Sequence, residues 1–367
     1  MRITEFKGIA AAVVLSAALF SCKKDSAPVG EQEVNPVKGK YEDGFFIINE
    51  GWFGHGTGSV SFFDAASASL KDSIFQKENP GKGFEPASST VQFGTMFKNN
   101  LYVVSKAKGP VVVADAKTMK EVGRIPGSSE YDWRAFVGID DNNGLLSSSD
   151  GIYLVNLKTY KPMMRLLGTK GQTGDMLKAE NYVYALSQSD GAVIYNVSDY
   201  SVAKKIKGVT LGFARTPNGK VWYTAGKYLY QSDPKSLATD SVELPFTPST
   251  TWSTWYASPI TASSTENTVF LVKANSWGGG KTLYRYVSGN KASLDQPFVT
   301  TPDKQSFYKN NLGYYAKTDE LVTGTVQDGF GANYLVNKLY FYNAKTGVLN
   351  KTITYGEYYF PAMFVFH

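Results

Sequence analysis

One short motif recurs along the sequence: a run of β-branched and aromatic residues, then Asp or Asn, two more residues, and Ser or Thr. Asp or Asn at such a position accepts hydrogen bonds from the backbone just after it, and the chain reverses. Each copy therefore predicts a strand followed by a turn into the next strand. The copies are VSFFDAAS, VVVADAKT, YLVNLKT, VIYNVSD, LYQSDPKS, LYFYNAKT and a degenerate LYRYVSGN without the acidic or amide residue.

A second strand-like segment precedes every copy of the motif. These segments are FFIINE, NLYVVSK, GLLSSS, YVYALSQ, KVWYTAG, TVFLVKA and ELVTGTV. The period is roughly forty residues, and no long segment has helical periodicity. We expect an all-β protein, a seven-bladed β-propeller with four strands in each blade. A pair of β-sandwiches is the alternative, but sandwiches do not repeat one hairpin seven times.

The two ends of the repeat region predict how the ring closes. The first unit begins directly with FFIINE and lacks an innermost strand, whereas the chain ends in the apolar segment YYFPAMFVFH, which has no hairpin partner. Pairing Phe360 to Phe366 into the first blade would remove the open sheet edge. We therefore expect residues 44–367 to form the propeller, closed by its C-terminal strand.

The N-terminal segment predicts export and anchoring. Residues 9–20 form a short apolar run behind Arg2 and Lys7, as in a signal peptide over residues 1–21. The segment LFSC, ending at Cys22, resembles the lipobox of bacterial lipoproteins, in which the cysteine is acylated. Residues 22–43 are polar and predict a flexible tether. A cleaved signal with an incidental cysteine is the alternative.

The composition argues against several kinds of chemistry. A Ser-His-Asp triad would have to use His55 or the terminal His367, and no G-x-S-x-G segment occurs. One cysteine and two histidines are too few for a His/Cys metal site. The formal net charge is +6, and the sequence has no long block of like charges, so nucleic acid is not an expected partner. We expect a protein that is not an enzyme and needs no cofactor. A calcium ion held by Glu50, Asp132 or Asp175 is an open alternative to turn-capping carboxylates.

Aromatic residues gather in loops that this scheme places on one face of the ring, the loops between second and third strands and between blades. Five of the six tryptophans fall there, next to glycine-rich turns. Exposed rings mark binding surfaces, although such rings can also close the channel or pack over their own loops. The expected ligand contacts are Trp52, Phe53, His55, Tyr131, Trp133, Arg134, Trp252, Trp255, Trp277, Phe330 and Tyr358.

The segments IINEGWFGHGTGSVSFFD and YYFPAMFVF, with the hairpins between them, resemble lipoprotein β-propellers of gut Bacteroidetes related to YVTN-repeat, surface-layer-like proteins. Relatives of that family capture cobalamin for a TonB-dependent outer-membrane transporter. The resemblance implies a surface-exposed, outer-membrane lipoprotein that binds a small molecule and passes it to such a transporter. A corrinoid is the first candidate for that molecule. A protein-interaction or glycan-binding scaffold and a metal-dependent lactonase or lyase are the alternatives.

Overall fold

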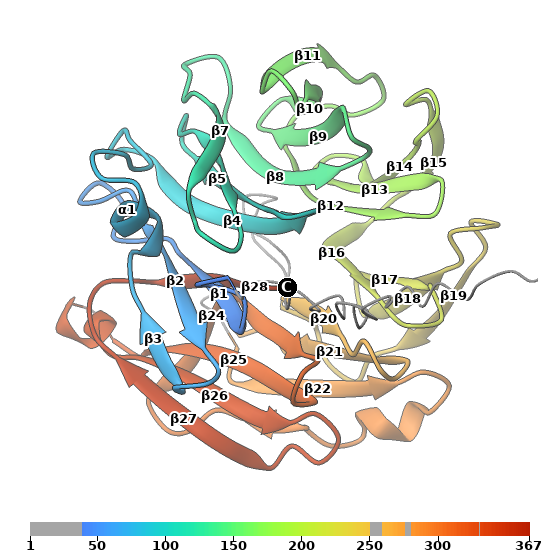
Figure 1. Ribbon diagram of the computed structural model, residues 1–367. Coiled ribbons are helices and arrows are strands. Elements are labelled where there is room, and N and C mark those ends of the chain that lie inside the picture. The colour runs from blue at the N-terminus through green and yellow to red at the C-terminus, as the bar shows by residue number, and fades with distance from the viewer. Residues whose placement is uncertain (1–38, 250–258, 276–279, 330) are drawn as a thin grey trace, which may run out of the picture. The chain divides into compact units, whose positions relative to one another are not determined.

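The computed structural model describes residues 39–249, 259–275, 280–329 and 331–367, all within one compact unit, Lys38–His367. In this described part, groups of four antiparallel strands follow one another around a centre (Figure 1); five of them are separate sheets, and the other two are joined edge to edge in one eight-stranded sheet. These groups are seven blades, so the predicted seven-bladed β-propeller is confirmed. No helix among the described residues is long and apolar enough to cross a membrane.

Each blade has four strands, which are named from the innermost outward. Blade 1 contains β28 (Pro361–Phe366), β1 (Gly44–Asn49), β2 (Ser59–Asp64) and β3 (Ser69–Lys71); blade 2 contains β4 (Thr90–Phe97), β5 (Asn100–Lys106), β6 (Val111–Asp115) and β7 (Glu121–Ile125); blade 3 contains β8 (Trp133–Gly138), β9 (Asn143–Ser148), β10 (Gly151–Asn156) and β11 (Lys161–Arg165); blade 4 contains β12 (Thr173–Ala179), β13 (Tyr182–Ser187), β14 (Gly191–Asn196) and β15 (Val202–Ile206). Blade 5 contains β16 (Val209–Arg215), β17 (Val221–Ala225), β18 (Tyr228–Ser232) and β19 (Thr239–Glu243); blade 6 contains β20 (Ile260–Ala262), β21 (Thr268–Val272), β22 (Thr282–Val287) and β23 (Val299–Thr300); blade 7 contains β24 (Gln305–Tyr315), β25 (Glu320–Gln327), β26 (Asn337–Asn343) and β27 (Leu349–Tyr355). Among the described residues, three short helices lie in connections: α1 (Ile74–Glu78), η1 (Lys291–Leu294) and η2 (Gly331–Leu335).

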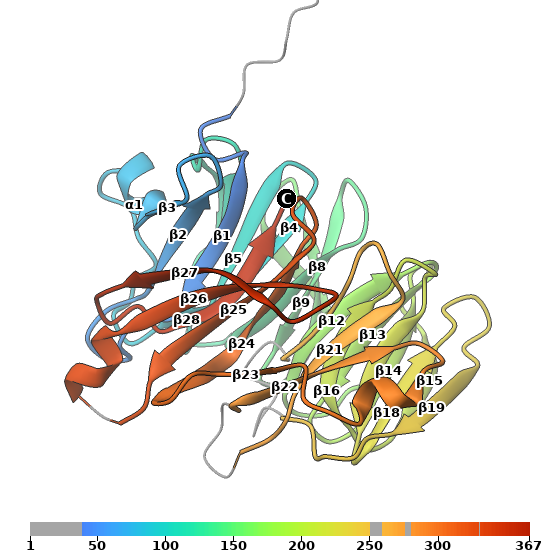
Figure 2. The ribbon, with the colours of Figure 1, turned by 90° about the horizontal axis from the view of Figure 1, so that it is seen from below.

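The C-terminal strand closes the ring as predicted. β28 pairs antiparallel with β1, with Phe45 opposite Phe366 and Ile48 opposite Met363. On its other side it meets β24 in a short parallel contact (Figure 2). Blade 1 therefore joins strands from opposite ends of the propeller.

Side chains from neighbouring blades interlock around the ring. The described residues form seven apolar clusters, and each fills the space between two adjacent blades. Between blades 7 and 1, Phe45 lies edge-to-face with Phe364 of β28, at 5.5 Å between ring centroids. α1 adds its buried Ile74 and Phe75 to the cluster between blades 1 and 2. The burial of these side chains stabilises the ring.

The recurring motif forms the turn from the third strand to the fourth. In blade 2, the Oδ1 atom of Asp115 accepts hydrogen bonds from the backbone nitrogens of Lys117 and Thr118, at 3.1 and 2.9 Å. Asn156 and Asn343 accept the corresponding bonds in blades 3 and 7. The predicted turn chemistry is confirmed at these positions.

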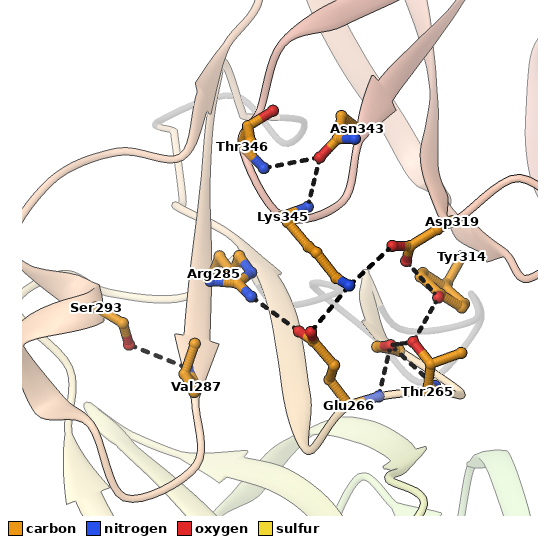
Figure 3. A network of polar contacts seen from close by, with 11 residues as sticks. Thr265, Glu266, Arg285, Val287, Ser293, Tyr314, Asp319, Asn343, Lys345 and Thr346 are labelled. Carbon is orange, nitrogen blue, oxygen red and sulfur yellow. Dashed lines mark hydrogen bonds and ion pairs between the residues drawn. The ribbon is translucent and has the colours of Figure 1, made fainter.

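A polar network connects blades 6 and 7 on the face that carries these turns (Figure 3). Glu266 accepts from Arg285 at 3.1 Å and lies 3.4 Å from the ammonium of Lys345, which is also 3.5 Å from Asp319. The hydrogen bond to Glu266 raises the pKa of Lys345. Such exposed pairs contribute little stability each, but together they fix the position of three turns.

Candidate functional site

The opposite face of the ring, which we call the loop face, carries the loops from second to third strands and from each blade to the next. A cavity of about 440 Å³ opens on it, where blades 7, 1, 2 and 3 converge. Its lining residues are Glu50, Gly51, Trp52, Phe53, Lys106, Ala107, Asp132, Tyr308 and Phe360. Aromatic rings form one part of the wall and charged groups the other.

The loop between β1 and β2 forms the aromatic lip of the cavity. Trp52 and Phe53 are 45% and 60% exposed, unusually high fractions for such large rings. The backbone turns back at once, because His55 and Gly56 both donate to the Trp52 carbonyl oxygen, at 2.8 and 3.1 Å. The indole of Trp52 packs between His55 and Tyr358, with centroids 4.2 and 4.6 Å away. The lip is therefore an ordered aromatic surface that solvent reaches.

Two glycines pinch the base of this loop. Gly51 and Gly58 have φ values of 74° and 81°, in the region that residues with a side chain rarely adopt. A Cβ atom on Gly58 would lie 2.4 Å from the carbonyl oxygen of Asn49 and 2.7 Å from that of Glu50. The two backbones can approach this closely only because both residues lack a side chain. This neck holds the lip over the cavity.

A buried ion pair lies on the cavity floor. The Oε1 atom of Glu50 accepts from the Nζ atom of Lys106 at 2.8 Å, and its Oε2 atom accepts from the hydroxyl of Tyr308 at 2.6 Å. Both charged side chains are only 7% exposed. Glu50 follows β1 and Lys106 ends β5, so the two charges occupy matching places in blades 1 and 2. Each charge compensates the other in a poorly solvated place.

A second ion pair lies beside the first. Asp132 accepts from both terminal nitrogens of Arg134, one of them at 2.7 Å, and from the backbone nitrogen of Ala107, also at 2.7 Å. The Arg134 side chain is 2% exposed, and that of Asp132 is 24% exposed. Asp132 thus lines the cavity, while the buried guanidinium of Arg134 fixes the position of the Asp132 carboxylate.

The remaining wall comes from the segment that leads into β28. Phe360 has φ of 47°, a strained value for a bulky residue. Backbone hydrogen bonds at 2.9 Å hold it there, from Glu50 to the Phe360 carbonyl oxygen and from Gly51 to that of Tyr359. The ring lies 5.6 Å from that of Tyr308. Backbone strain that surrounding contacts maintain is common where side chains are positioned for binding.

The expected contact residues differ in where the structure places them. Trp52 and Phe53 line the cavity; His55 and Tyr358 flank Trp52 without lining it. Tyr131 is partly buried and stacks on Trp133. Four others, and Cys22, lie outside the described residues; they are Trp252, Trp255, Trp277 and Phe330. Of the predicted tether only residues 39–43 are described, and this end is not a free linker, because Tyr41 is 2% exposed and packs in the cluster between blades 1 and 2.

Trp133 and Arg134 differ from the expectation of exposed contacts. Trp133 is the first residue of β8 and is fully buried, stacked on Tyr131 at 4.7 Å within the cluster between blades 2 and 3. Arg134 is 3% exposed and points to Asp132. The connecting loop ends before Trp133, so the indole enters the interface between blades.

Sequence reasoning missed Lys106, Ala107 and Phe360 as lining residues. A signal for the first was present, because FFIINE and NLYVVSK, from neighbouring repeats, end in residues of opposite charge. Glu50 and Asp132 were considered only as calcium ligands. They instead accept hydrogen bonds from Lys106 and Arg134.

The third carboxylate considered for calcium lies elsewhere. Asp175 is in β12, and its Oδ2 atom accepts from the backbone nitrogen of Phe213 at 3.2 Å. Although part of the residue is exposed, its carboxyl lies among protein atoms, and this desolvation raises its pKa to about 6. Within the described ranges, no group of three or more His, Cys, Asp or Glu side chains is placed to hold a metal ion.

Comparison with known sequences gives one family. The sequence model of DUF5074, described as a domain of unknown function, matches residues 43–367. No curated protein sequence matches the chain.

Comparison with solved structures gives the fold. A quinonprotein alcohol dehydrogenase-like protein from Bacteroides thetaiotaomicron has a TM-score of 0.73 at 17% identity, over 89% of this chain and 78% of that one. The dihydro-heme d1 dehydrogenase NirN, in complex with DHE, has a TM-score of 0.55 at 9% identity, over 90% of this chain and 77% of that one. At such low identity these likenesses show the fold alone and assign no catalytic role.

Proposed function

This chain belongs to the DUF5074 family, and we propose that it is a non-catalytic binding protein that captures a small organic molecule in the cavity beneath Trp52 and Phe53. One observation carries the proposal: two exposed aromatic rings border a cavity whose floor is polar and buried. Small-molecule sites have volumes of roughly 300–1,000 Å³ and combine apolar walls with a few placed polar groups. The cavity has both properties.

The ligand to test first is a corrinoid such as cobalamin. A corrin ring is planar and surrounded by amides, so it could rest on Trp52 and Phe53 while one edge enters the cavity. The resemblance of the sequence to cobalamin-capturing propellers supports this choice. A lipid anchor at Cys22 would hold the propeller at the outer membrane, where a TonB-dependent transporter would receive the ligand.

Isothermal titration of the purified protein with cyanocobalamin tests the ligand. We expect saturable binding that Trp52→Ala or Phe53→Ala weakens about tenfold or more, because a central aromatic contact is lost. Tyr228→Ala is the matched control, since Tyr228 is 43% exposed but lies on β18 of blade 5. Equal affinity in Trp52→Ala and wild type would exclude the lip as the contact. No heat of binding at all would exclude cobalamin, while smaller planar molecules could still occupy the cavity.

The anchor is tested separately. Cells fed an alkyne-bearing fatty acid should label the wild-type protein and not the Cys22→Ser variant. Equal labelling of both would remove Cys22 as the acylation site.

A further inference from the structure

We infer that the cavity selects a ligand whose inserted group carries no net charge. This inference rests on the proposed function and adds the chemical class of the ligand. It follows from how the charges on the cavity floor are paired, together with the flat rings at its mouth.

The charges at the floor sum to zero. Glu50 and Asp132 are the carboxylates, and Lys106 and Arg134 are the cations. Glu50 uses one oxygen for Lys106 and the other for Tyr308, and Asp132 uses both for Arg134. Each carboxylate is therefore already satisfied by groups of the protein itself.

Because the charged side chains of the cavity floor are buried, their zero net charge affects which ligand groups can enter. Three of the four charged side chains are at most 7% exposed, so water screens their charges weakly. A charged ligand group entering the cavity would lose its own hydration. It would gain an opposite charge only by separating a pair that is already formed, which leaves another buried charge uncompensated. An uncharged group avoids both costs and can still meet the polar floor through its dipoles.

The aromatic lip favours a flat ligand. Trp52, Phe53 and Phe360 offer ring faces and edges at the mouth, and a flat π-system gains contact area with them at little conformational cost. The predicted class is thus an uncharged planar aromatic or heteroaromatic group, with amide or similar polar substituents.

Three probes of one shape test this inference. Indole-3-acetamide, indole-3-acetate and tryptamine share a ring and a two-carbon side chain, and at pH 7 they are neutral, anionic and cationic. Their affinities for the wild-type protein can be measured by titration with ligand-observed NMR. We expect the amide to bind about tenfold or more tightly than either ion, because only the ions must break a buried pair.

Changing the floor charges should change the preference in a defined direction. Glu50→Gln leaves the Lys106 cation, so the acetate should gain most. Lys106→Met leaves the Glu50 carboxylate, so tryptamine should gain most. The double variant Glu50→Gln/Lys106→Met is neutral again and should prefer the amide. It also keeps the test valid if a single variant fails to fold, because it contains no uncompensated charge.

Each result has one meaning. If an ion binds the wild type as tightly as the amide, or if the variants leave the order unchanged, the inference is wrong while the cavity remains a binding site. If none of the three probes binds, the inference is wrong, and the titration with cyanocobalamin decides separately whether the proposed function stands.

Discussion

The carboxylate of Glu50 and the ammonium of Lys106 lie 2.8 Å apart, although 56 residues separate them in the sequence. Glu50 directly follows the second strand of blade 1 and Lys106 ends that of blade 2, and the propeller brings these places together beneath the aromatic lip. Removing one partner alone would leave a charge in a place that water hardly reaches.

Lys106→Met should therefore destabilise the protein by about 3–5 kcal/mol at neutral pH, as measured by urea unfolding. The double variant Glu50→Gln/Lys106→Met should recover part of this loss, because neither charge remains. Lys98→Met is the control: the pair of Lys98 with Asp141 is exposed, so its loss should have almost no effect. A double variant less stable than Lys106→Met would contradict the account of the pair.

The neck of the lip loop gives a second prediction. Gly58 and Gly54 both have φ of 81°, but a Cβ atom would clash with two carbonyl oxygens at Gly58 and meet nothing within 4 Å at Gly54. Both alanine variants should lose about 1 kcal/mol for the backbone conformation, and Gly58→Ala should lose more because of the clash. Thermal unfolding of the two variants measures the difference. Equal losses would mean that the neck relaxes freely.

The pH dependence of stability should reflect Asp175. Its pKa is about 6 in the folded protein and near 3.8 in an unfolded chain, so the folded state binds the proton more tightly. This contribution is fully present below pH 3.8 and is lost as the pH rises through 6. Asp175→Asn does not suffer this loss, so between about pH 4 and pH 7 its stability relative to wild type should rise by about 3 kcal/mol or less.

Urea unfolding at several pH values tests this, with Asp64→Asn as a control of opposite sign. The hydrogen bond from Lys71 lowers the pKa of Asp64 to about 2, so the Asp64 contribution is present above pH 3.8 and is lost as the pH falls through 2. A pH-independent difference between Asp175→Asn and wild type would show that the carboxyl titrates normally.

Ring closure gives a fourth prediction. Phe364 of β28 is 4% exposed and packs on Phe45 in the cluster between blades 7 and 1. Phe364→Ala should cost about 3–5 kcal/mol, the usual range for removing a buried phenylalanine ring. Val348→Ala, at a residue that is 60% exposed, should cost little. A small effect of Phe364→Ala in calorimetry would mean that closure does not depend on this ring.

The sequence predicted the fold well because its information is local and repeated. Asp115 and its counterparts specify a turn with their own neighbours in sequence, and seven copies leave few architectures to choose from. The open first unit and the apolar last segment predicted which strands meet, since both ends needed a partner.

The site was predicted only in part. Trp52 and Phe53 were found because a loop rich in glycine and aromatic residues is unusual by itself. The ion pairs were not found, because the partner of Glu50 is defined by the packing of blades and not by nearby sequence. Trp133 was expected in a loop between blades, but it is the first residue of β8, an inner strand that is buried on both faces.

The closure by β28 also has a consequence for biosynthesis. Blade 1 is begun by β1, β2 and β3, but its inner edge stays open until Pro361–Phe366 has been synthesised. Blade 1 therefore remains incomplete until the last strand of the propeller has been made. During that interval its unpaired strand edge can pair with a strand of another chain. Folding and unfolding of the ring should consequently be cooperative, and the pairing of β28 with β1 should be the step that completes it.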